Sequence, residues 1–453
     1  MEKQMRLFEF SEKSIDDKST PAKGLKRKIK IPQRNQVEFK VETLDESIPA
    51  DHQARTVWNF IKLLDFSEVY ERYSSLEDDV GRPIADPKVL VALWIYAICD
   101  GIISARKIAQ YCLENKAYAW LCGGIGVGHH LLSGFRSKFS DVFEGFVIQS
   151  IAILLKKDLI TLKRVSQDGK KLRASASLSM HRKSTIISKA MDVRKHIKDL
   201  EEELQRGNFE KEQKKTKHRE LLETQKKKER LIQAAKELQK HKENLNKNRA
   251  KNRNSRLAKK DVSNLRISTT DPECRKMKMA DSSYKPAYNV QIATDVDTEL
   301  VLKTGISQNS DDGGELLPMY SAIRNIYGVK INSYLADSAF RNKEDFQKMF
   351  NSGCFIYLPT KKKKTLSLRK RVLSGNCDQD TEADKEWIRR MEKKESNELY
   401  NRRIRVSETM NAFLVNHGMQ RLLVRGVKKV KGFIDLACLA YNMITINRLY
   451  EII

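Results

Sequence analysis

Three acidic residues have the types and surroundings that metal-dependent phosphodiester chemistry requires. Asp168 closes one predicted strand, Asp337 closes another, and Glu408 lies on a predicted helix further along the chain. Convergent carboxylates can hold two divalent cations about 3.5 to 4 Å apart, which activate a nucleophile and stabilise the leaving oxygen. Such ligands suit Mg²⁺, which prefers oxygen donors. Because ligands of open α/β sheets sit beyond the carboxyl ends of strands, the two aspartates are expected at one sheet edge.

Each of these acids also has an ordinary structural interpretation. Asp168-Gly169 is a common turn dipeptide, Asp337-Ser338 a common start of a helix, and Glu408 an ordinary helical acid with Arg405 three residues before it. Other acids near predicted strand ends compete for the same role: Asp295, Asp297, Asp311 and Asp312. Taken singly, none of the acids identifies a site.

The elements around these acids predict a mixed α/β domain. Residues 164–177 suit a short strand, an Asp168-Gly169 turn and a second strand. Further strands are predicted from alternating or apolar runs at 288–294, 299–306, 329–336 and 354–358. Helices are predicted at 313–327, 342–351, 382–417 and 427–448. This order predicts a mixed sheet with helices on its faces.

A helical module is predicted at residues 48–160. Asp86-Pro87 starts one of its helices, with proline in the first turn. Glycines at 123–128 interrupt the module; because no strand precedes them and no Gly-Lys-Ser/Thr follows, a connection fits better than a nucleotide loop. Four basic residues near the turns of this module are candidates for DNA contact: Arg106, Lys107, Arg136 and Lys138.

A charged helical insertion is predicted at residues 181–260. Between residues 191 and 260, 23 Lys and Arg face 12 Asp and Glu, a net charge of +11. The segment reads as one long helix or as a hairpin broken at Gly207-Asn208. It fits either a solvated coiled coil or an arm lying on phosphates. It separates residues 161–180 from 261–453, which together form the predicted catalytic domain.

Composition indicates a nucleic-acid partner. The chain has 453 residues and a net charge of +27, which favours a polyanion as partner. No apolar stretch reaches membrane-spanning length and no signal peptide is recognised, so a cytoplasmic protein is expected. Residues 1–47 read as a flexible tail, and residues 361–371 hold seven basic residues. Seven cysteines without a CxxC pair exclude the usual zinc and disulfide frameworks, and no second pair completes a metal site at Cys122, His129 and His130.

Several ordered blocks resemble bacterial insertion-sequence transposases of the DDE class, in which an N-terminal helical domain precedes an RNase H-like catalytic domain. The helical blocks lie at residues 48–55, 81–83, 104–108 and 120–124. The catalytic blocks are Asp-Gly-Lys-Lys-Leu-Arg-Ala-Ser-Ala at 168–176, Thr-Thr-Asp-Pro at 269–272, Tyr-Asn-Val-Gln at 288–291, Ala-Asp-Ser at 336–338, Tyr-x2-Arg-x4-Glu at 400–408, and residues 423–432. The resemblance runs from about residue 48 to residue 449.

The resemblance implies a DNA transposase whose metal-binding triad is Asp168, Asp337 and Glu408. It implies neighbouring strands for the two aspartates, and contacts of Tyr400 and Arg403 with transposon-end DNA, to which we add Arg405. Two Mg²⁺ ions are expected, with Mn²⁺ as a substitute. The expected partners are double-stranded transposon ends and target DNA, bound by a homodimer in the synaptic complex and located at the nucleoid.

Two departures from the family pattern leave alternatives open. Val415 stands where the family usually has lysine, seven residues after the glutamate. The last turn of the helical module reads Gly128-His129-His130 in place of Pro-Asp-His. The alternatives are a metal-dependent nuclease or domesticated recombinase on the same fold, and a catalytically decayed DNA-binding protein.

Overall fold

The computed structural model describes residue 35 and residues 41–73, 84–207, 209–251, 264–360, 363–375 and 380–450. Its contacts divide the chain into two units, residues 1–43 and residues 44–453, and the second unit contains all the elements below. Most of the predicted tail, the block at 81–83 and the start of the basic run at 361–371 lie outside the described residues.

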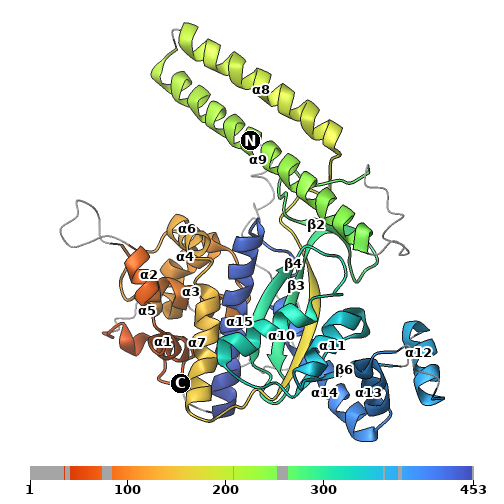
Figure 1. Ribbon diagram of the computed structural model, residues 1–453. Coiled ribbons are helices and arrows are strands. Elements are labelled where there is room, and N and C mark those ends of the chain that lie inside the picture. The colour runs from red at the N-terminus through yellow and green to blue at the C-terminus, as the bar shows by residue number, and fades with distance from the viewer. Residues whose placement is uncertain are drawn as a thin grey trace, which may run out of the picture. The chain divides into compact units, whose positions relative to one another are not determined.

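A mixed sheet forms the centre of the second unit (Figure 1). Its strands are β1 (Arg164–Arg173), β2 (Arg275–Lys278), β3 (Tyr284–Asp295), β4 (Val301–Ser307), β5 (Ser333–Leu335) and β6 (Phe355–Tyr357). The order is β2-β3-β1-β5-β6, with β4 also paired to β3. β1 is antiparallel to β3 and parallel to β5, which is parallel to β6. This is the predicted RNase H-like α/β arrangement.

The turn predicted at Asp168-Gly169 is wrong, because β1 runs straight through it. Each residue of β1 from Val165, opposite Asp295, to Arg173, opposite Ala287, is paired with β3. Asp-Gly favours a turn only locally, and a long antiparallel partner overrides that preference. Asp168 therefore lies in the middle of a ten-residue strand instead of ending a short one.

The helical module is all-helical, as predicted, and it consists of several short helices. Its helices are α1 (Gln53–Lys62), α2 (Ser67–Arg72), α3 (Pro87–Cys99), α4 (Ala105–Glu114), α5 (Lys116–Cys122), α6 (His129–Lys138) and α7 (Phe143–Lys156). Asp86 caps α3 by accepting a hydrogen bond from the Lys88 N–H at 2.8 Å. The glycine stretch separates α5 from α6, and a short non-helical segment separates α6 from α7.

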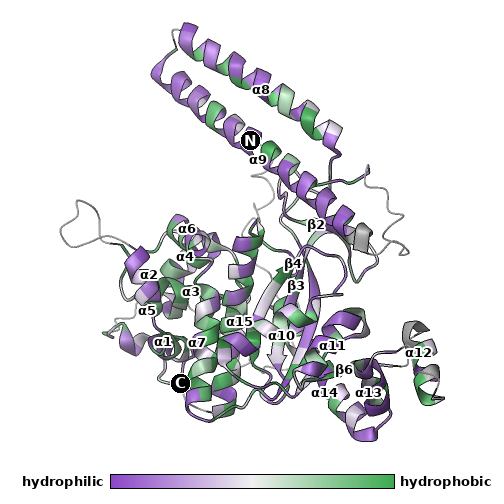
Figure 2. Ribbon diagram, viewed as in Figure 1, coloured by the Kyte–Doolittle hydropathy of each residue, from purple (hydrophilic) through white to green (hydrophobic). Residues whose placement is uncertain are grey.

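Helix α15 (Val427–Tyr450) joins this module to the sheet, and apolar residues run along α3, α7 and α15 (Figure 2). It packs on α3, α7 and β4. The Asn442 side chain bonds both the N–H and the C=O of Val301, each at 2.8 Å. Lys431 lies 2.8 Å from Glu144 and 2.9 Å from buried Asp435. Apolar packing and buried polar contacts together hold α7, α15 and β4 as one body.

The charged insertion is a helical hairpin, which confirms one of the two predicted alternatives. Helices α8 (Lys183–Arg206) and α9 (Lys211–Lys251) pack along each other (Figure 1). The hairpin has its own small apolar core: Ile186, Val193, Ile197, Leu231, Ala234, Leu238 and Ile267. At its base, the backbones of His181 and Ile267 exchange hydrogen bonds of 2.8 and 2.9 Å.

The remaining helices cover the sheet and extend from it. They are α10 (Leu316–Tyr327), α11 (Lys343–Asn351), α12 (Lys363–Leu373), α13 (Glu382–Met391) and α14 (Lys394–Asn416). The single helix predicted at 382–417 is thus two helices, and the basic run at 361–371 continues into α12. No helix among the described residues is long and apolar enough to cross a membrane.

Candidate active site

Asp168 lies within β1, and Asp337 follows the end of β5, the neighbouring parallel strand. The last paired residues of β1 and β5 are Ser166 and Leu335. Asp168 comes two residues after Ser166 within β1, and Asp337 comes two residues after Leu335, beyond the end of β5. Asp337 accepts a hydrogen bond from the Ser338 N–H at 2.6 Å, at the start of a short 3₁₀ helix, Ser338–Phe340. The prediction that the strands bearing the two aspartates are neighbours is confirmed.

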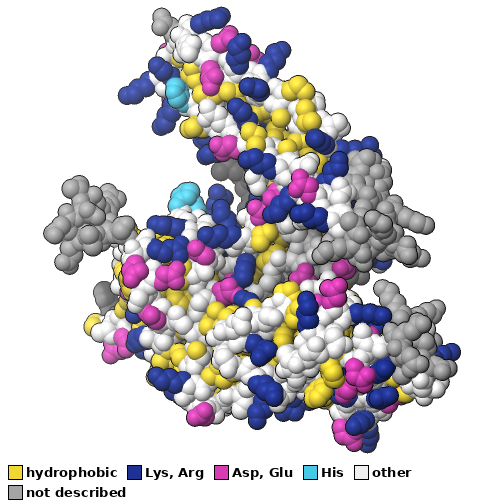
Figure 3. All heavy atoms as spheres, viewed as in Figure 1, with side chains coloured by type: hydrophobic (Ala, Val, Ile, Leu, Met, Phe, Trp, Pro, Cys, Tyr) yellow, Lys and Arg dark blue, Asp and Glu magenta, His cyan; other side chains and the backbone are white. Residues whose placement is uncertain are grey.

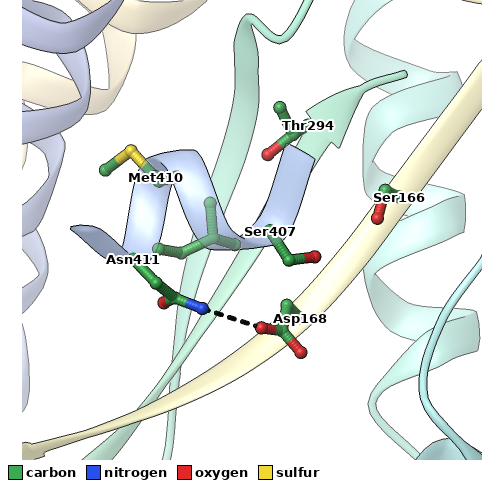
Figure 4. A pocket seen from close by; sticks show the side chains of 7 residues that line it. Ser166, Asp168, Thr294, Ser407, Met410 and Asn411 are labelled. Atoms are coloured by element: carbon green, nitrogen blue, oxygen red, sulfur yellow. Dashed lines mark hydrogen bonds between the residues drawn. The ribbon is translucent and has the colours of Figure 1, made fainter. Parts of the chain in front are cut away.

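Helix α14 supplies two donors to the Asp168 carboxylate. Arg403 Nη2 lies 2.9 Å from Oδ1, and Asn411 Nδ2 donates to Oδ2 at 3.0 Å (Figure 4). Burial raises the pKa of Asp168, and the Arg403 charge and the Asn411 hydrogen bond act against that rise. The two donors therefore orient the carboxylate and stabilise its charged form.

Asn411 was not predicted from the sequence. It lies eight residues after Arg403, slightly more than two helical turns, so both side chains can reach one strand. Helical spacing from Arg403 is the signal that could have identified it.

A small pocket opens beside Asp168, between β1, β3 and α14 (Figure 4). It is lined by Ser166, Asp168, Ile292, Thr294, Ser407, Met410 and Asn411. Ser166 shares a strand face with Asp168, and its buried hydroxyl has no hydrogen-bond partner among the described residues. Hydroxyl and carboxylate oxygens are ligands that a hard divalent cation prefers, and they can accept hydrogen bonds from water molecules bound to such a cation.

Glu408 lies apart from this pair. Ser407, Met410 and Asn411 of α14 line the pocket beside Asp168, whereas Glu408 of the same helix is exposed and does not line it. Among the residues that the structure describes, no group of three or more His, Cys, Asp or Glu side chains is placed to hold a metal ion. The two aspartates fit a divalent cation, whereas the third acid does not converge on them in this conformation.

Tyr400 and Arg403 lie together at the aspartate pair. The Arg403 guanidinium carbon is 5.9 Å from the centre of the Tyr400 ring. Burial raises the pKa of Tyr400, and the charges of Asp337 and Asp168 add to that rise while Arg403 opposes it. Arg405 turns elsewhere: its guanidinium pairs with Glu299 at 2.6 Å, and its side chain is 77% exposed.

The four basic candidates of the helical module divide into three surface residues and one core residue. Arg106, Lys107 and Lys138 are exposed. Arg136 is 7% exposed, and its guanidinium carbon lies 4.3 Å from the Trp94 ring centre. The prediction that Arg136 is accessible to DNA is wrong, because α3 and α15 enclose it. Burial lowers its pKa to about 10.

Comparison with protein families gives two matches. A transposase domain (DUF772) matches residues 42–138, and a transposase DDE domain matches residues 261–443. The chain belongs to the insertion-sequence DDE transposases. Its partner is DNA, and the family generally uses divalent metal ions. Comparison with curated proteins and with solved structures gives no significant match.

The match to the DDE domain includes Asp337 and Glu408 but begins after the hairpin, so Asp168 lies outside both matched segments. Strand pairing in the sheet nevertheless connects Asp168 to the matched DDE domain. β1 of the transposase pairs with β3 and β5, which both fall inside the matched domain. The helical insertion therefore interrupts one domain in the sequence without dividing it in space.

On the opposite face of β1, the transposase places Asp312 against the backbone of Gly169. An ideal Cβ at Gly169 would lie 2.3 Å from Asp312 Oδ1 and 2.9 Å from Gln291 Nε2. The same Oδ1 accepts hydrogen bonds from Asn289 and Gln291, each at 2.7 Å. Asp312, one of the competing acids in the sequence, is thus held against Gly169, the residue that follows Asp168. Its negative charge raises the pKa of Asp168 further.

Gly169→Ala is expected to reduce DNA cleavage by about 10- to 100-fold, because the new methyl group displaces Asp312 or bends β1 beside Asp168. The measurement is single-turnover cleavage of end-containing DNA. The control is Gly305→Ala in β4, where the nearest atom to a new Cβ is Met319 Cε at 3.4 Å. Equal rates for the two variants would show that Gly169 has no special role.

Proposed function

We propose that this transposase binds the terminal inverted repeats of its insertion sequence, hydrolyses the phosphodiester at each end and transfers the exposed 3′-hydroxyl to target DNA. The observation that supports this most directly is that Asp168 lies on β1 and Asp337 follows β5, the parallel neighbour of β1, in a chain of the DDE family. A net charge of +27 supplies the attraction to DNA.

In this proposal Asp168, Asp337 and Glu408 hold two Mg²⁺ ions, for which Mn²⁺ substitutes. When bound, the ions activate the attacking oxygen and stabilise the leaving one. Asp168 is oriented for this role by Arg403 and Asn411. Because Glu408 is exposed in this structure, its participation requires α14 or its own side chain to move toward the aspartates.

DNA contacts are proposed at the exposed basic residues of the helical module, Arg106, Lys107 and Lys138, and at Tyr400, Arg403 and Arg405 on α14. Residues 48–160 would recognise the ends, while residues 161–180 and 261–453 would cut them. Since two ends must be held at once, a homodimer is proposed for the synaptic complex.

A catalytically decayed DNA-binding protein is the second candidate. The observation that favours it is the position of Glu408, which leaves no three-acid group among the described residues. Such a protein would bind DNA with the same salt dependence and would cleave none.

The experiment that separates the candidates uses purified protein and DNA carrying the ends of the element. Mg²⁺ should produce nicks at the ends, EDTA should abolish them, and Asp337→Asn should leave DNA binding intact while removing cleavage. Cleavage by Asp337→Asn at the wild-type rate would refute the site assignment. Binding without any cleavage by the wild-type protein would favour the decayed form.

A further inference from the structure

The excess positive charge of the hairpin belongs almost entirely to one of its two helices. α8 carries six Lys and Arg against five Asp and Glu, whereas α9 carries fifteen against six, a net charge of +9. Lys and Arg side chains project from the hairpin in Figure 3. A helix that only needed solubility would carry acids and bases in similar numbers, as α8 does.

The basic residues of α9 include a stripe of six exposed lysines on its outer face. Its members are Lys211, Lys215, Lys226, Lys236, Lys240 and Lys247. At 100° per residue they fall in a sector of roughly 80°, centred opposite the buried Leu231. Glu229 is the one acid of α9 in that sector. The stripe therefore points away from the α8–α9 contact.

The lysine stripe has no partner within the described part of the protein. None of the six lysines forms an ion pair there, although Lys217 pairs with Glu203 and Arg219 with Glu223 elsewhere on the hairpin. The apolar core of the hairpin uses none of them. Like charges along one helix face repel each other, so the stripe disfavours the isolated hairpin and favours a bound polyanion.

The hairpin is fixed to the catalytic sheet at its base. Arg275 of β2 pairs with Glu237 of α9 at 3.3 Å, with 7% and 11% of the two side chains exposed. Together with the backbone pairing of His181 and Ile267, this contact anchors α9 next to the strand that pairs with β3. Between Lys211 and Lys247 the stripe extends about 54 Å, a length comparable to about sixteen base pairs.

We propose that the lysine stripe of α9 binds the phosphate backbone of duplex DNA without reading its sequence. The inference rests on the proposed function, since it assigns part of the DNA contact to a surface outside both family matches. Each lysine that neutralises a phosphate releases a counterion, adding about 0.9 to the slope of log affinity against log salt concentration.

The test compares two triple variants of the full-length protein that remove the same charge from the same hairpin. Lys226→Gln/Lys236→Gln/Lys240→Gln alters the stripe, and Lys183→Gln/Arg194→Gln/Lys195→Gln alters exposed residues of α8. Binding to a random duplex of about 40 base pairs is measured by fluorescence anisotropy over a range of NaCl concentrations. The stripe variant should lower the slope by about 2 to 3 and the affinity at 0.1 M salt by at least about tenfold, whereas the α8 variant should change neither.

Equal losses in the two variants would overturn the proposal, because net charge alone would then explain them. An unchanged slope in the stripe variant would also overturn it, including the case in which sedimentation shows a lost dimer and the stripe is a protein interface. Circular dichroism checks that both variants stay helical. End cleavage at saturating DNA should persist in both, so a failure here is distinct from a failure of Asp337→Asn to abolish cleavage.

Discussion

Asp168→Asn is expected to reduce Mg²⁺-dependent cleavage by about 10³-fold or more while the protein remains folded. Asparagine has the shape of aspartate, so β1 keeps its pairing with β3 and β5. It lacks the negative charge, and its single oxygen cannot accept from both Arg403 and Asn411 as the carboxylate does. The lost hydrogen bond is worth about 1 kcal/mol of stability, far less than the loss in cleavage.

The matched control for this variant is Asp297→Asn. Asp297 is an acid of the same sheet region that pairs with Arg164 at 2.7 Å and Arg402 at 2.9 Å. Both variants remove one negative charge, and only Asp168 adjoins Asp337. Single-turnover cleavage at saturating DNA and Mg²⁺ is the measurement. Comparable rates for the two variants would remove Asp168 from the active site.

Gly432→Ala is expected to destabilise the transposase by about 3 kcal/mol. An added Cβ on α15 would lie 2.2 Å from the Ser140 carbonyl oxygen and 2.6 Å from its Cα. These are backbone atoms of the segment between α6 and α7, so no side-chain rotation relieves the contact. Helix α15 would have to move away from the helical module, which loosens its packing on α3, α7 and β4.

Chemical denaturation followed by circular dichroism measures this effect, with Gly134→Ala as control. Gly134 is an exposed residue of α6, and a Cβ there would meet no atom within 4 Å. Alanine at an exposed helical position stabilises by up to about 1 kcal/mol. The two substitutions are chemically identical and should move stability in opposite directions. A stable Gly432→Ala protein would show that α15 does not pack closely on Ser140.

The sequence predicts the positions of the strands better than it predicts how the strands pair and where they end. Strands β3 and β4 follow from alternating or apolar runs of residues, which are local features of the sequence. Whether Asp168-Gly169 forms a turn or continues a strand depends on β3, which lies more than 100 residues away in the chain. The local preference of Asp-Gly for a turn therefore predicts the wrong structure. Periodicity reports which residues can form a strand, and the length of the partner decides where that strand ends.

In the candidate active site as well, the local sequence does not determine which side chains face one another. Family blocks located Asp168, Asp337, Tyr400 and Arg403, which the structure gathers around β1, β5 and α14. Arg136 was misassigned because an arginine near a helix end looks accessible until distant rings enclose it. Glu408 and Ser407 are adjacent in the sequence, and only the rotation of α14 about its axis determines which of them faces Asp168.

The backbone pairing of His181 with Ile267 has a consequence for how the chain folds. β1 precedes β3 and β5 in the sequence, and the whole helical insertion lies between β1 and these two partner strands. Ordering such a loop disfavours long-range strand pairing and slows folding. Because the hairpin is held by contacts between sequential helices and has its own apolar core, we expect it to form before the sheet is complete. Once formed, the hairpin brings residues 181 and 267 together. The loop that must be closed before β1 pairs with β3 and β5 is then much shorter.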